Sequence, residues 1–137
     1  MATAVAKYWI CKRAPNAVYE ALECHGGNGY TEEWPMSRMF RQSPLNSIWE
    51  GSGNVICLDV LRAAGREPES LQAFAKFLAS GKGLDHRLDR LLHGLQRSMT
   101  DGTLADPVNA QFAARNLVDR MAVALQAILL ITEGDAD

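Results

Sequence analysis

The spacing of apolar residues constrains the fold of this chain more than any other feature of its sequence. Between residues 84 and 99, large apolar side chains recur mostly at intervals of three and four and so share one face of a helix: Leu84, Leu88, Leu91, Leu92, Leu95 and Met99. Arg87, Arg90 and Arg97 fall away from that face. No segment of the sequence shows the sustained alternation of a half-buried strand, so we predict an all-α fold, a helical bundle.

Prolines, glycines and short polar residues indicate where the predicted helices begin and end. We expect helices over residues 3–13, 15–25, 36–41, 52–64, from 68 onward, 84–99, and from 107 toward the C-terminus. Pro15 and Pro107 suit a first helical turn, and Gly65 followed by Pro68 is expected to stop the helix over 52–64. In the last helix, one apolar stripe is expected to face the core: Val108, Phe112, Val118, Met121, Leu125, Ile128 and Leu129. Residues 133–137 suggest a loose acidic tail.

The composition excludes several classes of protein. A chain of 137 residues has the length of one domain, and its net charge of -2 gives no electrostatic reason to bind nucleic acid or an anionic membrane. No apolar run approaches the roughly 18 residues of a membrane span. Cys11, Cys24 and Cys57 lack the spacing of zinc and redox sites, so we expect buried thiols in a reducing compartment and a cytoplasmic protein. His86 and His93 lie two helical turns apart with no carboxylate between them on that face, and we predict no metal site.

A glycine-rich turn, Gly26-Gly27-Asn28-Gly29, follows one of the predicted helices. Phosphate-binding loops of the P-loop and dinucleotide-binding kinds need a strand before the glycines and a helix N-terminus after them, so this turn is neither. Two interpretations remain open. The glycines either end the helix with positive φ angles or form a loop that a ligand approaches closely.

Residues 46–54 place a single carboxylate, Glu50, between Trp49 and a glycine, just before a predicted helix. Burial against Trp49 would disfavour the charged form and raise the pKa of Glu50 toward that of a general base. Residues 51–54 contain two glycines and two short polar side chains, which let a ligand approach the backbone. Alternatively, an acid ahead of a helix is favoured by the helix dipole, by about 0.3–1 kcal/mol, and is then purely structural.

Arg38 and Arg41 lie three residues apart on the predicted short helix, close in sequence to Glu32 and Glu33. Residues at this spacing are neighbours on a helix surface. We expect solvated ion pairs between these arginines and glutamates.

Three segments together resemble the C-terminal helical domain of the acyl-CoA dehydrogenases: residues 20–30, 32–41 and 44–62. The shared motifs are the Gly-Gly-x-Gly-Tyr turn, the Arg-x-x-Arg pair and the Trp-Glu-Gly-Ser box, in family order and spacing. The run from Asn46 to Asn54, followed by Leu-Asp-Val-Leu-Arg, is similar to that of the AidB-like, alkylation-response branch. On this resemblance, residues 1–65 carry the family's cofactor and active-site motifs. Residues 66–137 are additional helices that pack on the same bundle.

The resemblance implies a flavoenzyme that oxidises an acyl-CoA thioester between its α and β carbons, with Glu50 in the position of the general base. It implies FAD as cofactor and two groups of cofactor-binding residues: Glu23, Cys24, His25, Gly26 and Gly27, which approach the FAD of a neighbouring subunit, and Ser52, Gly53 and Asn54, which follow the base. Glu23, Ser52 and Asn54 stand where mainstream members carry Gln, Thr and Gln. A carboxylate at Glu23 would repel a pyrophosphate, so we expect it to contact the adenine or ribose.

The resemblance also implies partners. An acyl-CoA substrate, an electron-transfer partner and a homo-oligomer (dimer or tetramer) with FAD shared across subunits follow from it. The family's N-terminal helical domain and middle β-domain do not fit in 137 residues. We therefore expect this chain to be the C-terminal part of a longer protein and to be inactive by itself.

Two other functions remain as alternatives. AidB-like proteins are associated with double-stranded DNA through their extra helices, but residues 66–137 carry eight Lys or Arg against ten Asp or Glu. Only residues 82–97 form a local basic stretch, which is a weak electrostatic footprint for DNA. The other alternative is a helical oligomerisation module that has kept the Trp-Glu-Gly-Ser box without using it.

Overall fold

A computed structural model describes residues 1–102 and 104–134 of the chain. Its helices are α1 (Ala2–Cys24), α2 (Gly27–Tyr30), α3 (Pro35–Gln42), the 3-10 helix η1 (Ser43–Ser47), α4 (Gly53–Arg66), α5 (Pro68–Ala79), α6 (His86–Thr100) and α7 (Pro107–Glu133). The described residues contain no strand. The predicted all-α fold is confirmed.

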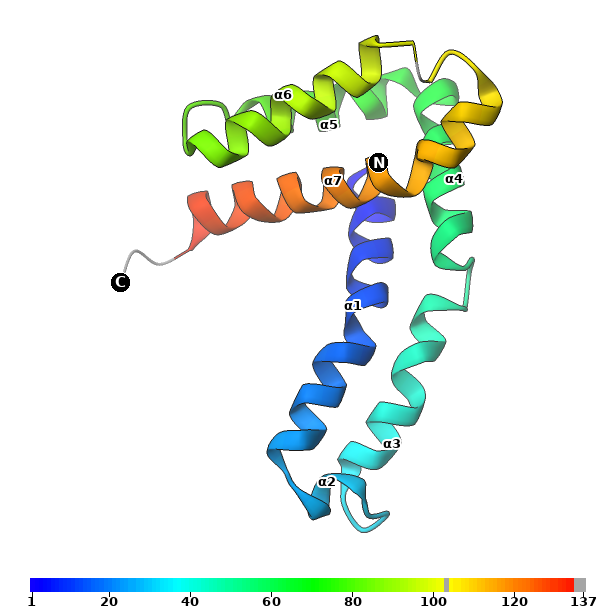
Figure 1. Ribbon diagram of the computed structural model, residues 1–137, viewed down its shortest axis with the longest axis vertical. Helices are drawn as coiled ribbons and strands as arrows, with labels where there is room; N and C mark the ends of the chain where they lie inside the picture. Colours follow the sequence, from blue (N-terminus) through cyan, green and yellow to red (C-terminus); the bar gives the residue numbers. More distant parts are fainter. Residues whose placement is uncertain (103, 135–137) are drawn as a thin grey trace.

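The helices form an elongated molecule with a broad end and a narrow end (Figure 1). In it, α1 runs alongside the succession α3, η1 and α4. At the broad end α7 packs across α1 and α4, and α5 and α6 lie along α7. We call residues 1–13, 53–102 and 104–134 the head. We call residues 14–48 the arm. Helix α2 lies at its far end, and residues 14 and 48 lie where the arm joins the head.

The hydrophobic core lies wholly in the head. Its fully buried large side chains come from three helices that meet there: Val5 and Tyr8 of α1, Cys57 and Val60 of α4, and Val118 and Ile128 of α7. Buried leucines of α5 and α6 extend this cluster along α7. In the arm, burial is sparse, with Met36 as its one buried apolar side chain among the described residues. The head therefore holds most of the apolar area that stabilises the fold.

The helix boundaries differ from the predicted ones at two places. Pro15 was expected to start a new helix, but α1 runs without interruption from Ala2 to Cys24 with Pro15 inside it. A proline in a helix interior costs about 3 kcal/mol because it cannot donate to the carbonyl four residues earlier. The contacts of α1 with α4 and α7 in the head and with α3 and η1 in the arm offset this cost. The axis of α1 bends partway along its length (Figure 1).

The second difference is the end of α4. The helix continues through Gly65 to Arg66 and ends at Glu67, whose backbone has φ -127° and ψ 68°. Glu67 precedes Pro68, and the proline ring disfavours helical backbone angles in the residue before it. The proline, rather than the glycine, therefore ends α4.

Some expected burial is also wrong. Phe112 is 85% exposed, and Val108 and Leu129 are also exposed, whereas Val118, Met121 and Ile128 are buried as expected. Phe112 lies nine residues before Met121, and at about 100° per residue this places the two on opposite sides of α7. Leu84 is likewise exposed, because it precedes α6 rather than lying within it.

The remaining expectations are divided. Cys57 is the one buried cysteine, while Cys24 is exposed and Cys11 is partly buried, so the expectation of three buried thiols is wrong. The predicted start of the last helix is confirmed, since the Asp106 side chain accepts from the backbone N–H of Asn109. Of the expected acidic tail, Glu133 belongs to α7 and residues 135–137 lie outside the described residues. None of the described helices is long and apolar enough to cross a membrane.

Candidate active site

The turn between η1 and α4 contains Glu50 in an unusual backbone conformation. Its φ is 58°, and it is the one non-glycine residue with positive φ among those described. Gly51 follows with φ 104°. For a residue with a Cβ, the left-handed region costs roughly 1–2 kcal/mol, so the surrounding structure must hold Glu50 in place.

Lys7 of α1 supplies that restraint. Its Nζ donates to the backbone carbonyl oxygens of Trp49 at 2.9 Å and Glu50 at 3.3 Å. The same ammonium lies 3.7 Å from the Glu50 carboxylate. Two carbonyl bonds from one cation fix the turn against α1, and such bonds contribute more than neutral ones.

The Glu50 carboxylate itself projects outward. Its side chain is 89% exposed, and Trp49 beside it is 65% exposed. The expectation that Trp49 encloses the carboxylate in a dry, apolar site is therefore wrong for the part of the chain that the structure describes. Both side chains lie at the surface, and the charged neighbour of the carboxylate is the Lys7 ammonium at 3.7 Å rather than an apolar wall. Any desolvation of Glu50 has to come from a surface that packs over it.

Ser52, Gly53 and Asn54 begin α4 directly after the turn. Ser52 is the N-cap but its hydroxyl makes no capping bond to the helix, and both Ser52 and Asn54 are exposed. Gly53 is buried, and a Cβ there would stand 3.3 Å from the Tyr8 ring and 2.6 Å from Cε of Lys12. Gly53 thus permits close packing of α4 on α1. The first backbone N–H groups of α4 have no acceptor within the helix, which suits an anionic ligand group.

The glycine-rich turn at the end of the arm holds the second group of predicted residues: Glu23, Cys24, His25, Gly26 and Gly27. All five are exposed. The backbone N–H groups of residues 25 and 26 bond to carbonyls three residues earlier, which closes α1, and Gly26 has φ 57°. The helix-stop interpretation therefore accounts for Gly26. It does not account for Gly27, because its φ is ordinary and an added Cβ would meet no atom within 4 Å.

Other contacts shape the same turn. Gly29 packs against α1, where an added Cβ would lie 2.2 Å from the carbonyl oxygen of Leu22. His25 Nδ1 donates to the carbonyl of Ala21 at 2.8 Å, which leaves Nε2 as the ring nitrogen facing a ligand. The Tyr19 hydroxyl bonds to the Glu23 carboxylate, and this bond raises the pKa of Tyr19.

The expected ion pair of the arm is confirmed for one of the two arginines. Arg41 donates to both carboxylate oxygens of Glu32, at 2.6 and 2.8 Å. These hydrogen bonds lower the pKa of Glu32 and raise that of Arg41. Since both side chains are exposed, the pair orients the start of α3 more than it stabilises the fold.

The two groups of predicted cofactor residues lie far apart in this chain. Glu50, Ser52, Gly53 and Asn54 are beside Lys7, whereas the glycine-rich turn follows Cys24 at the other end of α1. At 1.5 Å per residue, the 16 residues from Lys7 to Glu23 span roughly 24 Å of helix. The predicted residues therefore form two separate groups in one chain rather than one.

A buried polar cluster next to the turn fixes the position of α1. The Tyr8 hydroxyl donates to Asp119 Oδ1 at 2.7 Å, joining α1 to α7. Burial, and then the bond to Asp119, raise the pKa of Tyr8 to about 12. Burial also raises the pKa of the neighbouring Cys57 thiol to about 11. Because Lys7 precedes Tyr8, this cluster sets where the Lys7 ammonium lies.

Lys7 and Lys12 are the residues of this site that sequence reasoning missed. Lys7 is 42 residues from Trp49, and no spacing pattern relates the two. Only the packing of α1 on α4 brings them together. No group of three or more His, Cys, Asp or Glu that could hold a metal occurs among the described residues.

Comparison with known proteins gives consistent matches. The family model of the acyl-CoA dehydrogenase C-terminal domain matches residues 1–65. The putative acyl-CoA dehydrogenase AidB of Escherichia coli is 43% identical over 97 residues, covering 71% of this chain and 18% of that protein. Acyl-CoA dehydrogenase family member 11 of Caenorhabditis elegans is 34% identical over 101 residues, covering 71% of this chain and 16% of that protein.

A third relative, the cyclohexane-1-carbonyl-CoA dehydrogenase of Syntrophus aciditrophicus, is 34% identical over 58 residues, or 42% of this chain and 15% of that protein. The chain thus spans less than a fifth of the length of these relatives. The first two alignments are longer than the 65 residues of the family match, so their similarity extends into the additional helices.

Proposed function

Residues 1–65 of this chain belong to the acyl-CoA dehydrogenase C-terminal domain family, and the chain as a whole is AidB-like; on that premise we propose that it is the C-terminal part of an FAD-dependent acyl-CoA dehydrogenase. Glu50 is its general base. The observation that supports this role most directly is the backbone of Glu50, held at positive φ by the two carbonyl bonds from Lys7 while the carboxylate projects freely. Strain at a single exposed carboxylate marks a position kept for function.

The reaction assigned to this site is the removal of the α-proton of an acyl-CoA thioester by the Glu50 carboxylate. FAD, when bound, supplies the acceptor for the β-hydrogen as hydride. Lys7 lies 3.7 Å from the carboxylate and orients it. Because the turn is already fixed, the carboxylate loses little conformational freedom when the substrate binds. Proton transfer by a positioned carboxylate contributes typically about 10²–10⁴-fold to such a rate.

The residues around the turn fit the anionic part of a flavin nucleotide. Ser52 and Asn54 are exposed at the N-terminus of α4, and Lys7 and Lys12 place positive charge beside it. At the far end of the arm, Gly27 offers a backbone position where an added Cβ would meet no atom of the described residues within 4 Å. Glu23 fits less well, since its carboxylate already accepts from Tyr19 and would repel phosphate. It is left with a contact to the adenine or ribose.

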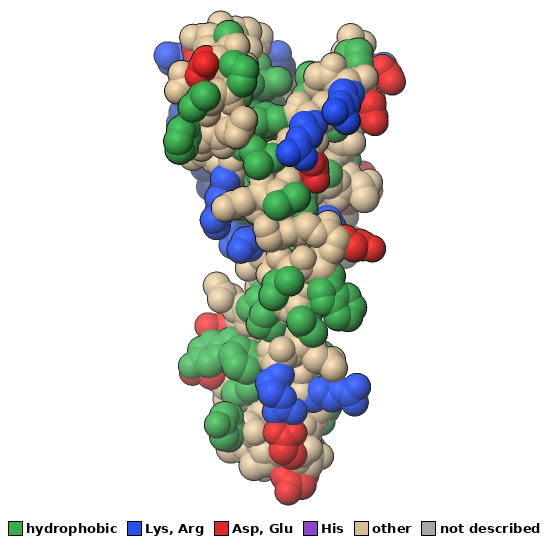
Figure 2. All heavy atoms as spheres, turned by 90° about the vertical axis from the view of Figure 1, so that its right-hand side faces the viewer, with side chains coloured by type: hydrophobic (Ala, Val, Ile, Leu, Met, Phe, Trp, Pro, Cys, Tyr) green, Lys and Arg blue, Asp and Glu red, His purple; other side chains and the backbone are tan. Residues whose placement is uncertain are grey.

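The site needs a second surface to complete it. Around Glu50 the large apolar side chains Leu45, Ile48, Trp49 and Val55 are all exposed. Figure 2 shows apolar side chains gathered about midway along this face, between groups of charged ones. We propose that another subunit or another part of a longer protein covers this patch and provides the dry environment that a base requires.

The two separated groups of residues support a shared cofactor. The turn and the far end of the arm are roughly 24 Å apart along α1. They cannot both contact the same end of one FAD molecule. In this proposal, the turn contacts the flavin nucleotide of its own active site, and residues 23–27 contact the FAD of a neighbouring subunit. The protein is then a dimer or tetramer that acts with an electron-transfer partner. A cytoplasmic location remains a prediction from the sequence.

The test is a Glu50→Gln substitution in the full-length protein. A true base is expected to lose at least 10²-fold of acyl-CoA-dependent FAD reduction while the protein keeps its flavin, measured by the bleaching of the flavin absorbance. Glu33→Gln, in an exposed turn of the arm, is the control and is expected to change neither quantity. A full-length protein that binds no FAD, or a Glu50→Gln protein with full turnover, contradicts the proposal and favours an oligomerisation module.

The DNA-binding alternative gains little from the structure. Within the basic stretch at residues 82–97, Arg87 is bonded to the Asp85 carboxylate, with Nη2 3.0 Å from Oδ2. That pairing lowers the pKa of Asp85, keeps the carboxylate ionised and neutralises one of the few positive charges there. Duplex binding that weakens steeply with salt would still be the observation that favours it.

A further inference from the structure

An apolar groove lies between α5 and α6, in the part of the head that the family match does not cover. Its volume is about 440 Å³. Its walls are leucines and alanines of α5 and leucines of α6, and its floor is formed by Leu117 and Met121 of α7. None of the residues that line it belongs to the candidate active site.

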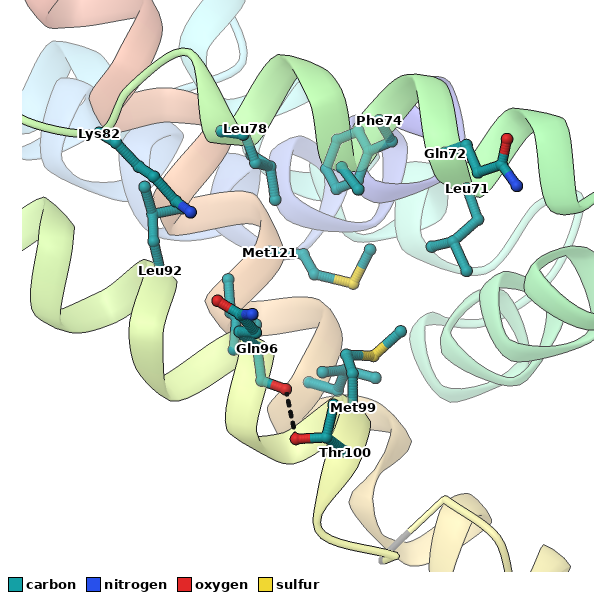
Figure 3. A pocket seen from close by; sticks show the side chains of 14 residues that line it. Leu71, Gln72, Phe74, Leu78, Lys82, Leu92, Gln96, Met99, Thr100 and Met121 are labelled. Carbon is teal, nitrogen blue, oxygen red and sulfur yellow. Dashed lines mark hydrogen bonds between the residues drawn. The ribbon is translucent and has the colours of Figure 1, made fainter.

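The groove exists because α5 and α6 diverge. Gly81 holds the connection between them against α7, where an added Cβ would come within 2.6 Å of Ile128 Cγ1 and 3.0 Å of Leu88 Cδ2. From that point the two helices separate, so the groove is narrow at Leu78 and Leu92 and wide at Leu71 and Met99 (Figure 3). Helix α6 packs on α7, and α5 packs mainly on α4 and to a lesser extent on α7.

Lys82 is the one charged residue among those that line the groove, and it lies at the narrow end. The Lys82 side chain extends from the end of α5 across the gap toward Leu92 (Figure 3). The residues that line the groove include no Asp or Glu. The nearest acids in sequence are already engaged: Asp85 with Arg87, and Asp89 with the backbone N–H of Gly83, at 2.9 Å. Among the described residues, Lys82 makes no ion pair, so its positive charge is available to a ligand.

The wide end leads into a second apolar cavity of about 380 Å³. The two share Leu71, Met99, Leu117 and Met121 as lining residues, so together they form one elongated apolar space. Two of these are methionines, whose flexible side chains adapt to ligands of different shape. A space of this size is in the range of small-molecule sites in proteins, roughly 300–1,000 Å³.

We propose that this groove binds a medium-chain fatty carboxylate, with its head at Lys82 and its tail along α6 toward Met99. The seven residues from Leu92 to Met99 span roughly 10 Å of helix. An extended chain advances roughly 1.2 Å per bond, so about eight carbon atoms fill this length. A longer tail reaches the second cavity. A long apolar slot closed by a single unpaired cation matches an anionic amphiphile better than it matches a neutral or cationic one.

The test uses decanoate and the whole chain, with binding measured by isothermal titration calorimetry. We expect one decanoate per chain, and about fourfold weaker binding for each methylene removed in the series from decanoate to octanoate. Lys82→Gln is expected to weaken binding about fivefold, the upper range for an exposed charge pair. Lys76→Gln, in the last turn of α5 and outside the groove, is the control for Lys82 in the turn that follows α5, and it is expected to bind like the unchanged protein. Decyltrimethylammonium, with the opposite charge, is expected not to bind at this site.

Replacing one of two alanines by leucine distinguishes an effect on the groove from an effect on folding. Ala75 lines the groove and Ala73 does not, although both are exposed on α5. Ala75→Leu is expected to fill the groove and weaken decanoate binding at least tenfold, while Ala73→Leu leaves it unchanged and both retain the helical circular dichroism. Equal affinity of the Lys82→Gln and Lys76→Gln proteins overturns the proposal. So does an absence of decanoate binding, including the case in which a second copy of the chain occupies the groove in solution.

Discussion

The head and the arm of this molecule differ in how far they bury their apolar side chains. In the head, five helices converge and bury a continuous core that runs from Val5 in α1 to Ile128 in α7. In the arm, α1 and α3 lie side by side, and large side chains on them and on the segment between them are exposed, among them Tyr30, Trp34, Met39 and Phe40. The Tyr19 and Phe40 rings, with centroids 5.8 Å apart, form an apolar contact between α1 and α3.

The difference shows which part of the chain depends on other surfaces. Three or more helices around a common axis enclose a core, whereas two helices expose most of their apolar faces to water. The proposed catalytic turn lies where head and arm meet, with its backbone fixed by the head through Lys7 and its side chains facing outward. The head thus buries most of the apolar side chains, and the arm leaves many of its own exposed.

The test with the largest expected effect truncates one isoleucine to alanine in each region. Ile128→Ala in the head is expected to lower the free energy of unfolding by about 2–5 kcal/mol, because Ile128 is fully buried. Ile48→Ala in the arm, just after η1, is expected to change the free energy of unfolding by less than about 0.5 kcal/mol, because Ile48 is 61% exposed. Urea unfolding followed by circular dichroism measures both. Equal losses would mean that the arm also holds a core.

The second test is alkaline pH, which acts on the head. Folding raises the pKa of Tyr8 from 10.0 to about 12, so the folded state holds this proton more tightly than the unfolded chain does. The resulting stability is fully present below pH 10 and is lost as pH rises from 10 to 12, by about 2–3 kcal/mol. Stability curves of the unchanged protein and of Tyr8→Phe between pH 8 and 12 check this.

The same measurement distinguishes the head from the arm. Cys57 adds a loss of the same sign above pH 9, since burial raises its pKa to about 11, and this loss persists in the Tyr8→Phe protein, where the hydrogen bond from Tyr8 no longer lowers that pKa. In the arm, the lowered pKa of Glu32 gives a contribution that is present above pH 4.5 and is lost as pH falls below it. An identical alkaline loss in Tyr8→Phe would show that Tyr8 is not its source.

The third test concerns two glycines at the end of the arm. Gly29→Ala is expected to cost about 2 kcal/mol, because its Cβ would collide with the backbone carbonyl of Leu22, which cannot move aside. Gly27→Ala is the matched control and is expected to stay within about 0.5 kcal/mol, since its Cβ would meet nothing. Amide hydrogen exchange of residues 22–30 reports the local effect. If both substitutions loosen the turn equally, α2 does not pack on α1 as described.

The smallest expected effect separates the backbone bonds of Lys7 from its charge pair. Lys7→Met removes both carbonyl bonds and is expected to cost about 1 kcal/mol. Glu50→Gln removes only the pairing with an exposed carboxylate and is expected to cost less than about 0.5 kcal/mol. Thermal unfolding compares the two. A larger loss in Glu50→Gln would assign the restraint of the turn to the ion pair instead.

Much of the local structure was predictable from the sequence. The period of apolar residues predicts helices, and caps such as Asp106 mark where they begin, because helix formation depends on neighbours within four residues. The Trp49-Glu50-Gly51-Ser52 box was recognisable for the same reason, since its residues are contiguous. The predictions failed where distant segments decide the outcome, as at Pro15, where packing on both sides holds one helix through a proline.

What the sequence alone determined is the all-α class, most of the longer helices, the family resemblance of residues 1–65 and the identity of the candidate base. What only the tertiary structure decided is how those helices meet. It brings Lys7 to the turn, leaves Glu50 exposed beside Trp49, puts Phe112 on the open side of α7 and separates α5 from α6 to form a groove. The physical reason is that helix propensity and capping are local, whereas the choice of which faces pack together depends on side chains tens of residues apart.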